Sequence, residues 1–279
     1  MLECNVSTTK YLILKILLIG GGNMGLTYAT SFLKAHVATA ADMMILEKSE
    51  SRAAELAKKN IGTVYGHPKD CLPKADVVIL AVKPQDTPVL FEAIKPYATD
   101  NQVFLSIMAG VKIEAIATSL NVTKVIRAMP NLPAQIGMGM TAFTSADSVT
   151  RSELVAVHNL LNTTGKTIYL DDERMIDAAT AISGSGPAYV YFFMNAMVDA
   201  AKSLGFTTSQ AELLVEQTFL GSVHLQNRND LSCSDWIKKV SSKGGTTEAA
   251  LKVFQSTTVN HDIKNGAKAA FDRAVELGK

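Results

Sequence analysis

Short, almost wholly apolar runs alternate with amphipathic stretches over the first half of this 279-residue chain. A strand with no polar face has to be buried on both sides, as in a parallel sheet whose connecting helices cover both faces. The alternation therefore predicts an α/β fold with a mainly parallel sheet. The expected strands are residues 12–19, 43–47, 77–82, 103–107 and 124–129, and the helices between them include 24–35, 51–59 and 87–94. A hairpin-like pair of strands, 138–144 and 167–170, is expected around a helix at 152–162.

The second half of the chain differs, because the strand patterns stop after Asp171. The helices expected there are residues 176–182, 188–204, 209–226, 234–240, 247–254 and 260–277. Two domains are therefore expected, residues 11–170 with the sheet and residues 171–279 built from helices alone. The segments 188–204 and 213–225 are apolar on more than one face, and such helices need burial on several sides. This pattern predicts a core shared between copies of the chain.

Composition argues against several kinds of partner and site. Basic and acidic residues nearly balance, 27 against 26, so neither a nucleic acid nor an anionic membrane is an expected partner. The apolar residues 11–19 are interrupted by Lys15 and are too few for a membrane span, which needs about 20 residues. Three scattered cysteines form no disulfide framework, which favours a reducing, cytoplasmic location. The five histidines show no metal-ligand spacing, so no metal is expected.

A G-x-G-x-x-G pattern stands between the first expected strand and the helix that follows it. In this context the pattern is typical of dinucleotide binding. Gly20 permits a tight turn, Gly22 lets the backbone approach a pyrophosphate, and Gly25 lets helix and strand pack closely. The helix N-terminus adds free N–H groups that face the phosphates. The alternative is a flexible turn with no ligand. The cofactor-binding residues expected here are Ile19, Gly20, Gly21, Gly22, Asn23, Met24 and Gly25.

Glu47 ends the second expected strand, 22 residues after Gly25. An acidic residue about 20 residues after the glycines binds the ribose hydroxyls of NAD, so Glu47 favours NADH. Ser49, Ser51 and Arg52 follow closely, however, and they suit the 2′-phosphate of NADPH if Glu47 turns away. Both dinucleotides therefore stay open, and so does the simpler interpretation of Glu47 as a solvated charge.

Ala81, Val82, Lys83 and Pro84 stand at the carboxyl end of the expected strand at 77–82. Ligands of parallel sheets lie outside the carboxyl ends of the strands, so this backbone is expected to line the cofactor crevice. Lys83 is equally consistent with an ordinary surface lysine.

A second glycine-rich corner lies where a late helix is expected to begin, at Gly244, Gly245, Thr246 and Thr247. Two glycines followed by hydroxyl residues at a helix start favour anion binding, because backbone N–H groups, the helix dipole and the hydroxyls all face the ligand. Ser242 adds a further donor. The alternative is simply a capped helix after a flexible loop.

Five segments occur in a characteristic order along the chain: Ile19-Gly20-Gly21-Gly22-Asn23-Met24, Leu80-Ala81-Val82-Lys83-Pro84-Gln85, Arg127-Ala128-Met129-Pro130-Asn131, Ser183-Gly184-Ser185-Gly186-Pro187-Ala188-Tyr189 and Gly244-Gly245-Thr246-Thr247. Together they give the chain a resemblance to the pyrroline-5-carboxylate reductase family, the enzymes of the last step of proline synthesis. The resemblance spans nearly the whole chain from Ile16 and implies an N-terminal Rossmann-like domain. It also implies a helical C-terminal domain that interlocks with a partner subunit in a homodimer, with dimers that commonly assemble into a decamer.

The resemblance further implies reduction of 1-pyrroline-5-carboxylate, a cyclic imine that carries a carboxylate, by a hydride from NADH or NADPH. The carboxylate is expected at the corner from Gly244 onwards, on the N–H groups of Gly245 and Thr246 with help from Ser242. Thr247 is the expected catalytic residue, with its hydroxyl hydrogen-bonded to the ring nitrogen. Threonine is too weak an acid to donate a proton itself, so Thr247 would orient the iminium or relay a proton from water.

Three residues depart from the family pattern. Lys243 stands where many relatives have proline, which could loosen the loop without removing its donors. Leu132 replaces a common threonine, and Lys239 lies where some relatives carry an asparagine near the site.

Two other functions fit parts of the sequence. A hydroxyacid or ketopantoate-type dehydrogenase shares the two-domain layout, but such enzymes use a lysine general acid, and the central helices offer only Lys202, near a helix end. A non-catalytic dinucleotide sensor predicts cofactor binding without turnover.

Overall fold

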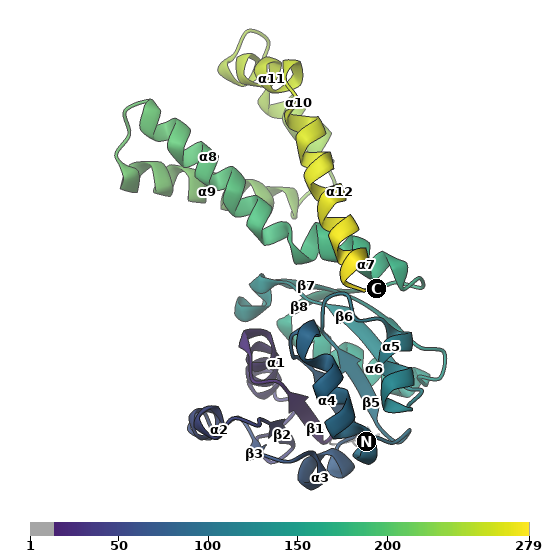
Figure 1. Cartoon of the computed structure of the whole chain (residues 1–279). Helices are drawn as coiled ribbons and strands as arrows, with labels where there is room; N and C mark the ends of the chain where they lie inside the picture. The colour runs from purple at the N-terminus through teal and green to yellow at the C-terminus, as the bar shows by residue number, and fades with distance from the viewer. Residues whose placement is uncertain (1–13, 279) are drawn as a thin grey trace, which may run out of the picture. The chain divides into compact units, whose positions relative to one another are not determined.

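An eight-stranded sheet in the order β3-β2-β1-β4-β5-β6-β7-β8 forms the centre of the first of two units (Figure 1). The computed structural model describes residues 14–278. All pairs of neighbouring strands among β1 to β6 are parallel, β6 and β7 are antiparallel, and β7 and β8 are parallel. The strands are β1 (Ile16–Ile19), β2 (Met43–Leu46), β3 (Thr63–Tyr65), β4 (Val77–Leu80), β5 (Val103–Ser106), β6 (Val125–Met129), β7 (Gly139–Ser145) and β8 (Gly165–Tyr169).

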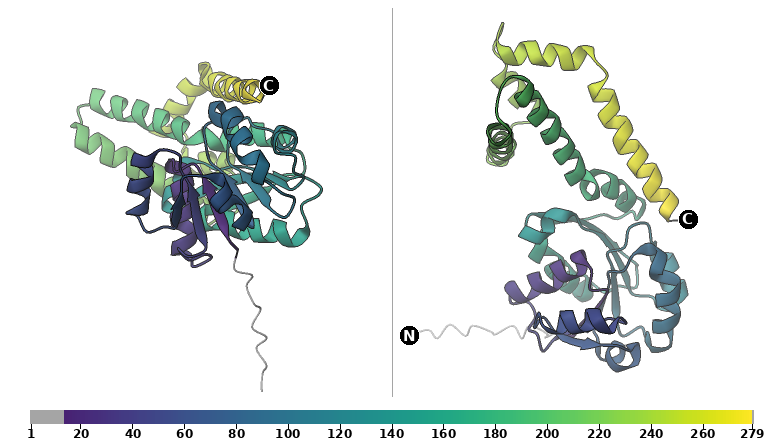
Figure 2. Two further views of the ribbon diagram at one scale, coloured as in Figure 1. Left: turned by 60° about the horizontal axis from the view of Figure 1, so that its bottom comes forward. Right: turned by 60° about the vertical axis from the view of Figure 1, so that its left-hand side comes forward.

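Helices cover both faces of this sheet (Figure 2). Alternate residues of the buried strands point to opposite faces, so Ile16 and Leu18 of β1 join one core cluster and Leu17 and Ile19 join the other. The helices of the unit are α1 (Asn23–Lys34), α2 (Glu50–Ala57), α3 (Pro68–Cys71), α4 (Thr87–Ile94), α5 (Ile113–Leu120), α6 (Arg151–Leu161) and α7 (Arg174–Ala179). The predicted α/β fold with a mainly parallel sheet is confirmed.

Two details of the predicted sheet were wrong. Strand β3 was not expected, because it has only three residues and sits half-exposed at the sheet edge, where no apolar run is needed. The segments near 138–144 and 167–170 do not form a hairpin-like pair, because β7 and β8 run parallel. The connection between them contains α6, as a crossover between parallel strands requires. Residues 11–13, which lie in the predicted domain and partly in its first strand, fall outside the described residues.

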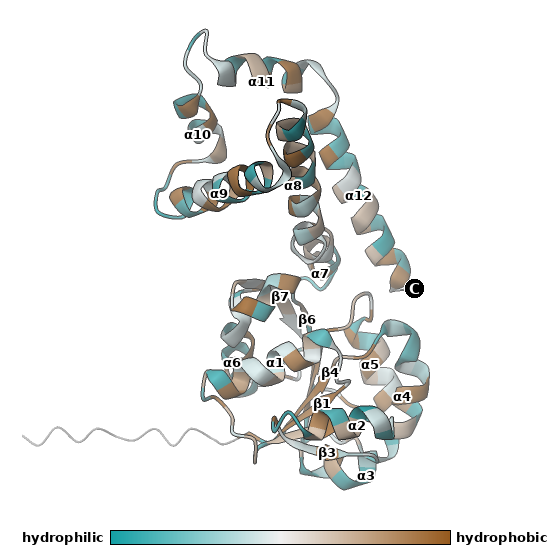
Figure 3. Cartoon of the chain, turned by 90° about the vertical axis from the view of Figure 1, so that its left-hand side faces the viewer, coloured by the Kyte–Doolittle hydropathy of each residue, from teal (hydrophilic) through white to brown (hydrophobic). Residues whose placement is uncertain are grey.

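The second unit, Ser185–Asp272, consists of helices. They are α8 (Gly186–Ser203), α9 (Thr208–Gln226), α10 (Cys233–Val240), α11 (Thr246–Ser256) and most of α12 (Val259–Leu277). Helix α8 packs against α9, yet no residue of α8 is fully buried, and only Ala211 and Val215 of the described part of this unit are buried apolar residues. Apolar residues recur along the exposed faces of these helices (Figure 3).

The compact units divide the chain at Gly184, whereas the predicted domains meet after residue 170. Helix α7 groups with the sheet because Arg127 of β6 bonds to Glu173, 3.1 Å, and to Asp177, 2.5 Å. The side chain of Asn131 also donates a hydrogen bond to the carbonyl oxygen of Ser183. The last residues of α12, from Arg273, belong to the first unit as well.

Candidate functional site

The turn between β1 and α1, residues Gly20 to Gly22 (the glycine turn), has the backbone that the glycine pattern predicts. Gly20 adopts φ +104°, and a Cβ atom there would lie 2.7 Å from the carbonyl oxygen of Ala81. A Cβ atom on Gly25 would lie 2.5 Å from the carbonyl oxygen of Gly20, so helix and strand pack too closely for any side chain at this position. A Cβ atom on Gly22, by contrast, would meet nothing within 4 Å. The backbone at Gly22 is therefore open to a ligand.

Helix α1 begins beside this opening without a side-chain cap. Its N-cap residue is Gly22, and the N–H of Leu26 donates to the Gly22 carbonyl oxygen. Among residues 14–278, no hydrogen-bond partner is found for the backbone N–H groups of Asn23, Met24 and Gly25. Free N–H groups and the positive end of the helix dipole favour an anion here, so the turn fits the pyrophosphate of a dinucleotide.

Glu47 follows β2 and is tied to its surroundings by two contacts. One carboxylate oxygen accepts the N–H of Ser49 at 3.0 Å, and the other lies 3.6 Å from Nε of Arg52. Arg52 in turn donates from Nη2 to the carbonyl oxygen of Gly21, at 2.5 Å. Arg52 therefore links the glycine turn to the end of β2, a role that the sequence did not predict. The hydroxyls of Ser49 and Ser51 lie 3.1 Å apart beside it, so groups suited to either dinucleotide are present.

The segment after β4 lies directly beside the glycine turn. The N–H of Ala81 donates to the carbonyl oxygen of Ile19, and a Cβ atom on Gly20 would also approach Cγ1 of Val82, at 3.1 Å. Lys83 is exposed, and Pro84 starts a short 3₁₀ turn, Pro84–Asp86. The structure thus brings Ala81 and Val82 to the turn and leaves the side chain of Lys83 in solvent.

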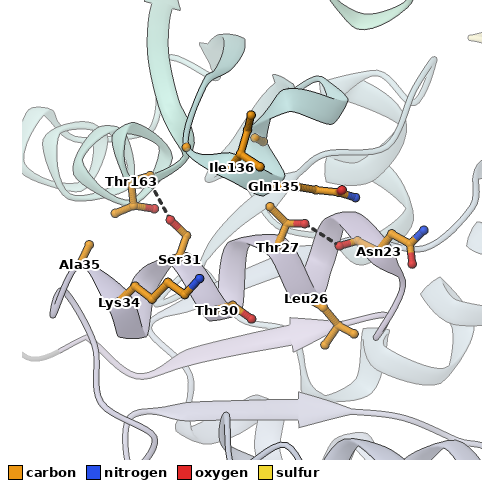
Figure 4. Close-up of a pocket in the computed structure, with 12 residues that line it drawn as sticks. Asn23, Leu26, Thr27, Thr30, Ser31, Lys34, Ala35, Gln135, Ile136 and Thr163 are labelled. Atoms are coloured by element: carbon orange, nitrogen blue, oxygen red, sulfur yellow. Dashed lines mark hydrogen bonds between the residues drawn. The ribbon is translucent and has the colours of Figure 1, made fainter. Parts of the chain in front are cut away.

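A groove opens along the flank of α1, between this helix and the 3₁₀ turn Leu132–Ile136 (Figure 4). At one end the groove is lined by Asn23, next to the glycine turn. Farther along α1, the hydroxyl of Ser31 donates a hydrogen bond to the carbonyl oxygen of Thr163, and both residues line the groove. Among the described residues, Lys34 is the one cationic side chain that lines it. Of the expected cofactor-binding residues only Asn23 lines the groove, so the groove extends away from the glycine turn.

The second glycine corner joins α10 to α11. Gly244 has φ +75°, a left-handed conformation that favours glycine, and a Cβ atom on Gly245 would lie 2.6 Å from Oγ of Ser242. Helix α11 begins at Thr246 with Gly245 as its N-cap and without a side-chain cap. In the part of the chain that the structure describes, the N–H groups of Thr246 and Thr247 have no partner. The corner is therefore a compact set of donors that suits an anion.

Two N–H groups of this corner are already engaged. The N–H of Gly245, expected to bind the substrate carboxylate, donates to the carbonyl oxygen of Ser242 at 3.0 Å. The N–H of Gly244 donates to Oε2 of Glu248 at 2.7 Å. Sequence reasoning missed Glu248, although its position three residues after the N-cap is typical of a capping residue. Of the departures from the family pattern, Lys239 lies over the ring of Trp236, 5.0 Å from its centroid.

Other chemistry-bearing residues are isolated from one another. Burial raises the pKa of the Cys71 thiol to about 11, so this cysteine is not a reactive nucleophile at neutral pH. His158 stacks on Phe143 and shares a hydrogen bond with Thr167. Within residues 14–278 no cluster of His, Cys, Asp and Glu side chains could hold a metal ion. Over the same residues, every helix is either too short or too polar to span a bilayer.

The sheet, the glycine turn and the helical second unit define a class: Rossmann-like α/β proteins with a dinucleotide-type turn and a helical C-terminal unit. A family model described as pyrroline-5-carboxylate reductase dimerisation matches residues 173–277. A second, described as NADP oxidoreductase, coenzyme F420-dependent, matches residues 15–110.

Individual proteins agree with these family models. A pyrroline-5-carboxylate reductase of Pseudomonas aeruginosa is 33% identical over 95% of this chain and 97% of its own length. The structure resembles a pyrroline-5-carboxylate reductase of Coxiella burnetii, with 30% identity, TM-score 0.87, and coverage of 95% of this chain and 99% of the other. It also resembles a Plasmodium falciparum pyrroline carboxylate reductase with NADP bound, with 25% identity, TM-score 0.85, and coverage of 95% and 98%. The chain belongs to the pyrroline-5-carboxylate reductase family, as its sequence motifs indicated.

Proposed function

We propose that this chain reduces 1-pyrroline-5-carboxylate to proline with NADH or NADPH. The observation that carries the proposal is the presence, in a member of this family, of two uncapped helix N-termini with free N–H groups. One lies at the glycine turn of the sheet unit and the other at the Gly244 corner of the helical unit. Each suits one anion of the reaction: the pyrophosphate of the dinucleotide and the carboxylate of the imine.

The dinucleotide is held by the first unit. The turn from Ile19 to Gly25 receives the pyrophosphate, Glu47 faces the ribose of the adenosine, and the backbone from Ala81 to Pro84 lines the cleft. The open space at Gly22 and the free N–H groups of α1 support this assignment. When bound, the reduced nicotinamide supplies the hydride. Glu47 and Arg52 lie side by side at the end of β2. The chain therefore offers both an acid for the ribose hydroxyls and a cation for a 2′-phosphate.

The substrate carboxylate is held by the second unit. The donors are the N–H groups of Gly244, Thr246 and Thr247 and the hydroxyl of Ser242, while the backbone of Gly244 and Gly245 gives the loop its shape. The hydroxyl of Thr247 hydrogen-bonds the ring nitrogen and orients the protonated imine. A hydride then adds to the carbon of the C=N bond while the nitrogen keeps the proton, which leaves a secondary amine. Positioning two reactants for such a transfer contributes up to roughly 7–11 kcal/mol.

The helical unit assembles copies of the chain into a homodimer. Its exposed apolar side chains on α8 and α9 and the match of the dimerisation family model support this assignment. Dimers assemble further, up to a decamer, and the protein works in the cytoplasm.

The decisive experiment is a spectrophotometric assay at the absorbance of reduced nicotinamide, with the cyclic imine and either NADH or NADPH. Oxidation of the dinucleotide that depends on the imine, with proline as product, supports the proposal. Turnover of a 2-keto acid in place of the imine would assign the chain to the hydroxyacid or ketopantoate-type dehydrogenases. Dinucleotide binding by calorimetry without turnover of either substrate would assign it as a sensor.

A further inference from the structure

The side chain of Glu248 contacts the corner at which the substrate carboxylate is proposed to bind. Its carboxylate oxygen Oε2 accepts the N–H of Gly244 at 2.7 Å, and the same oxygen lies 3.6 Å from Nζ of Lys252, one helical turn further along α11. The Glu248 side chain is 35% exposed and the Lys252 side chain is more exposed still. One oxygen of this partly exposed carboxylate therefore contacts two partners, a backbone N–H group and a lysine ammonium group.

This contact differs from the ordinary caps of the same protein. In α6 the side chain of Glu153 accepts the N–H of the N-cap residue Thr150, and in α9 Gln210 does the same for Thr207. In both helices the cap spans three residues. Glu248 instead reaches back four residues, past the N-cap Gly245, to an N–H group in the left-handed residue Gly244. The carboxylate thus lies against the loop that forms the corner.

A carboxylate in this place excludes a second one. Two anions cannot share the N–H of Gly244, and within a few ångströms of each other they repel. The remaining donors of the corner, at Thr246 and Thr247, belong to the same helix start. An incoming carboxylate therefore meets a helix N-terminus whose positive dipole is already partly neutralised.

We propose that Glu248 is an internal competitor of the substrate carboxylate. Its carboxylate holds the Gly244 N–H and has to release it, keeping only the contact with Lys252, before a small carboxylate can bind there. This inference rests on the proposed function, because it assigns the regulation of that same corner. It makes Glu248 a residue that sets substrate affinity and leaves the reacting atoms untouched.

The test compares the wild type with Glu248→Gln and Glu248→Ala in the imine reduction assay. Both substitutions remove the charge, but the glutamine amide oxygen can still accept the Gly244 N–H. We expect KM for the imine to fall about 3- to 10-fold in Glu248→Ala and less in Glu248→Gln, with kcat and dinucleotide affinity unchanged. The inhibition constant of L-proline, which carries the same carboxylate, is expected to fall in parallel.

Two controls separate this effect from others. Glu276→Gln removes an exposed carboxylate of α12 that pairs with Arg273 and is expected to leave KM unchanged. Salt at about 0.5 M screens a general charge effect, whereas competition for one N–H group persists. A KM that rises or stays constant in a folded Glu248→Ala variant, or a difference that disappears in salt, would overturn the competitor role while the active wild type upholds the proposed function. A wild type without imine turnover would overturn both.

Discussion

Thr247 occupies the second position of α11, beside the free N–H groups of the corner. Replacing it with alanine removes the hydroxyl and keeps the backbone donor, so the substrate carboxylate loses nothing. We expect Thr247→Ala to lower kcat/KM by roughly 10²-fold or more, because one preorganised donor to the reacting nitrogen is lost. Steady-state kinetics with the imine measure this, and a fluorescence titration checks that dinucleotide affinity is unchanged. Full activity in the variant would remove Thr247 from the mechanism.

At Gly22 a substitution can test dinucleotide binding without disturbing the fold. Because a Cβ atom there would meet nothing within 4 Å, Gly22→Val is expected to fold normally and to weaken NADH and NADPH binding alike, through contact with the pyrophosphate. Calorimetric titration with each dinucleotide measures the affinities. The matched variant is Gly25→Ala, whose Cβ atom would lie 2.5 Å from the Gly20 carbonyl oxygen and should lower Tm. Normal affinity in Gly22→Val would show that the dinucleotide binds elsewhere.

The sequence predicted those residues of the candidate site whose backbone is special. Gly20, Gly25 and Gly244 are required by positive φ angles or by close packing, and glycine spacing records such requirements directly. It did not predict the bond from Arg52 to Gly21 or the bond from Gly244 to Glu248. Both depend on the rotamer of a long side chain, and spacing along the chain does not determine a rotamer.

At the scale of elements, a buried ion-pair network joins the sheet to the helix that follows it. Arg127 of β6 is 1% exposed and bonds to Glu173 and Asp177 around α7, while Glu173 also accepts the N–H of Ile113 at the start of α5. The network therefore joins β6 to α7 through the guanidinium, and the start of α5 to both through Glu173. The sequence contained Arg127 within a family motif but gave no sign of these partners.

Arg127→Met would leave the carboxylates of Glu173 and Asp177 without a cation in a mostly buried setting. We expect it to lower the free energy of unfolding by about 3–5 kcal/mol, because a buried charge without a partner is costly. Urea unfolding at a fixed protein concentration measures this. The matched variant Arg174→Met breaks an exposed pair with Asp172 and should unfold like the wild type. Equal stability of the two variants would show that the network contributes little.

The errors in the predicted sheet have a physical cause at this same scale. Periodicity shows that a segment is extended and which face is apolar, but it does not show the direction of the neighbouring strand. The direction of β8 follows from the connection, since the residues between β7 and β8 include α6 and are typical of a parallel crossover. Strand β3 is short and half-exposed, so no pattern marked it.

At the scale of the whole molecule, the two units differ in how they hide their apolar residues. The sheet unit buries two extensive clusters, one on each face of the sheet. The helical unit leaves large side chains in solvent along α8 and α9, including Phe192 at 72% exposure and Leu213 at 68%. The sequence predicted this difference, because helices that are apolar on several faces cannot be covered by one neighbour alone.

The proposed homodimer follows from this exposure and gives the last prediction. In wild-type protein at micromolar concentration, sedimentation velocity is expected to show a dimer or larger assembly, with a Tm that rises with protein concentration. Phe192→Asp places a charge on the exposed face of α8 and should weaken self-association about tenfold or more. Val89→Asp is the matched control, because Val89 is 69% exposed on α4 of the sheet unit and should not affect assembly. A wild type that sediments as a monomer would leave the apolar faces of α8 and α9 without their proposed partner, since nothing else in the described chain covers them.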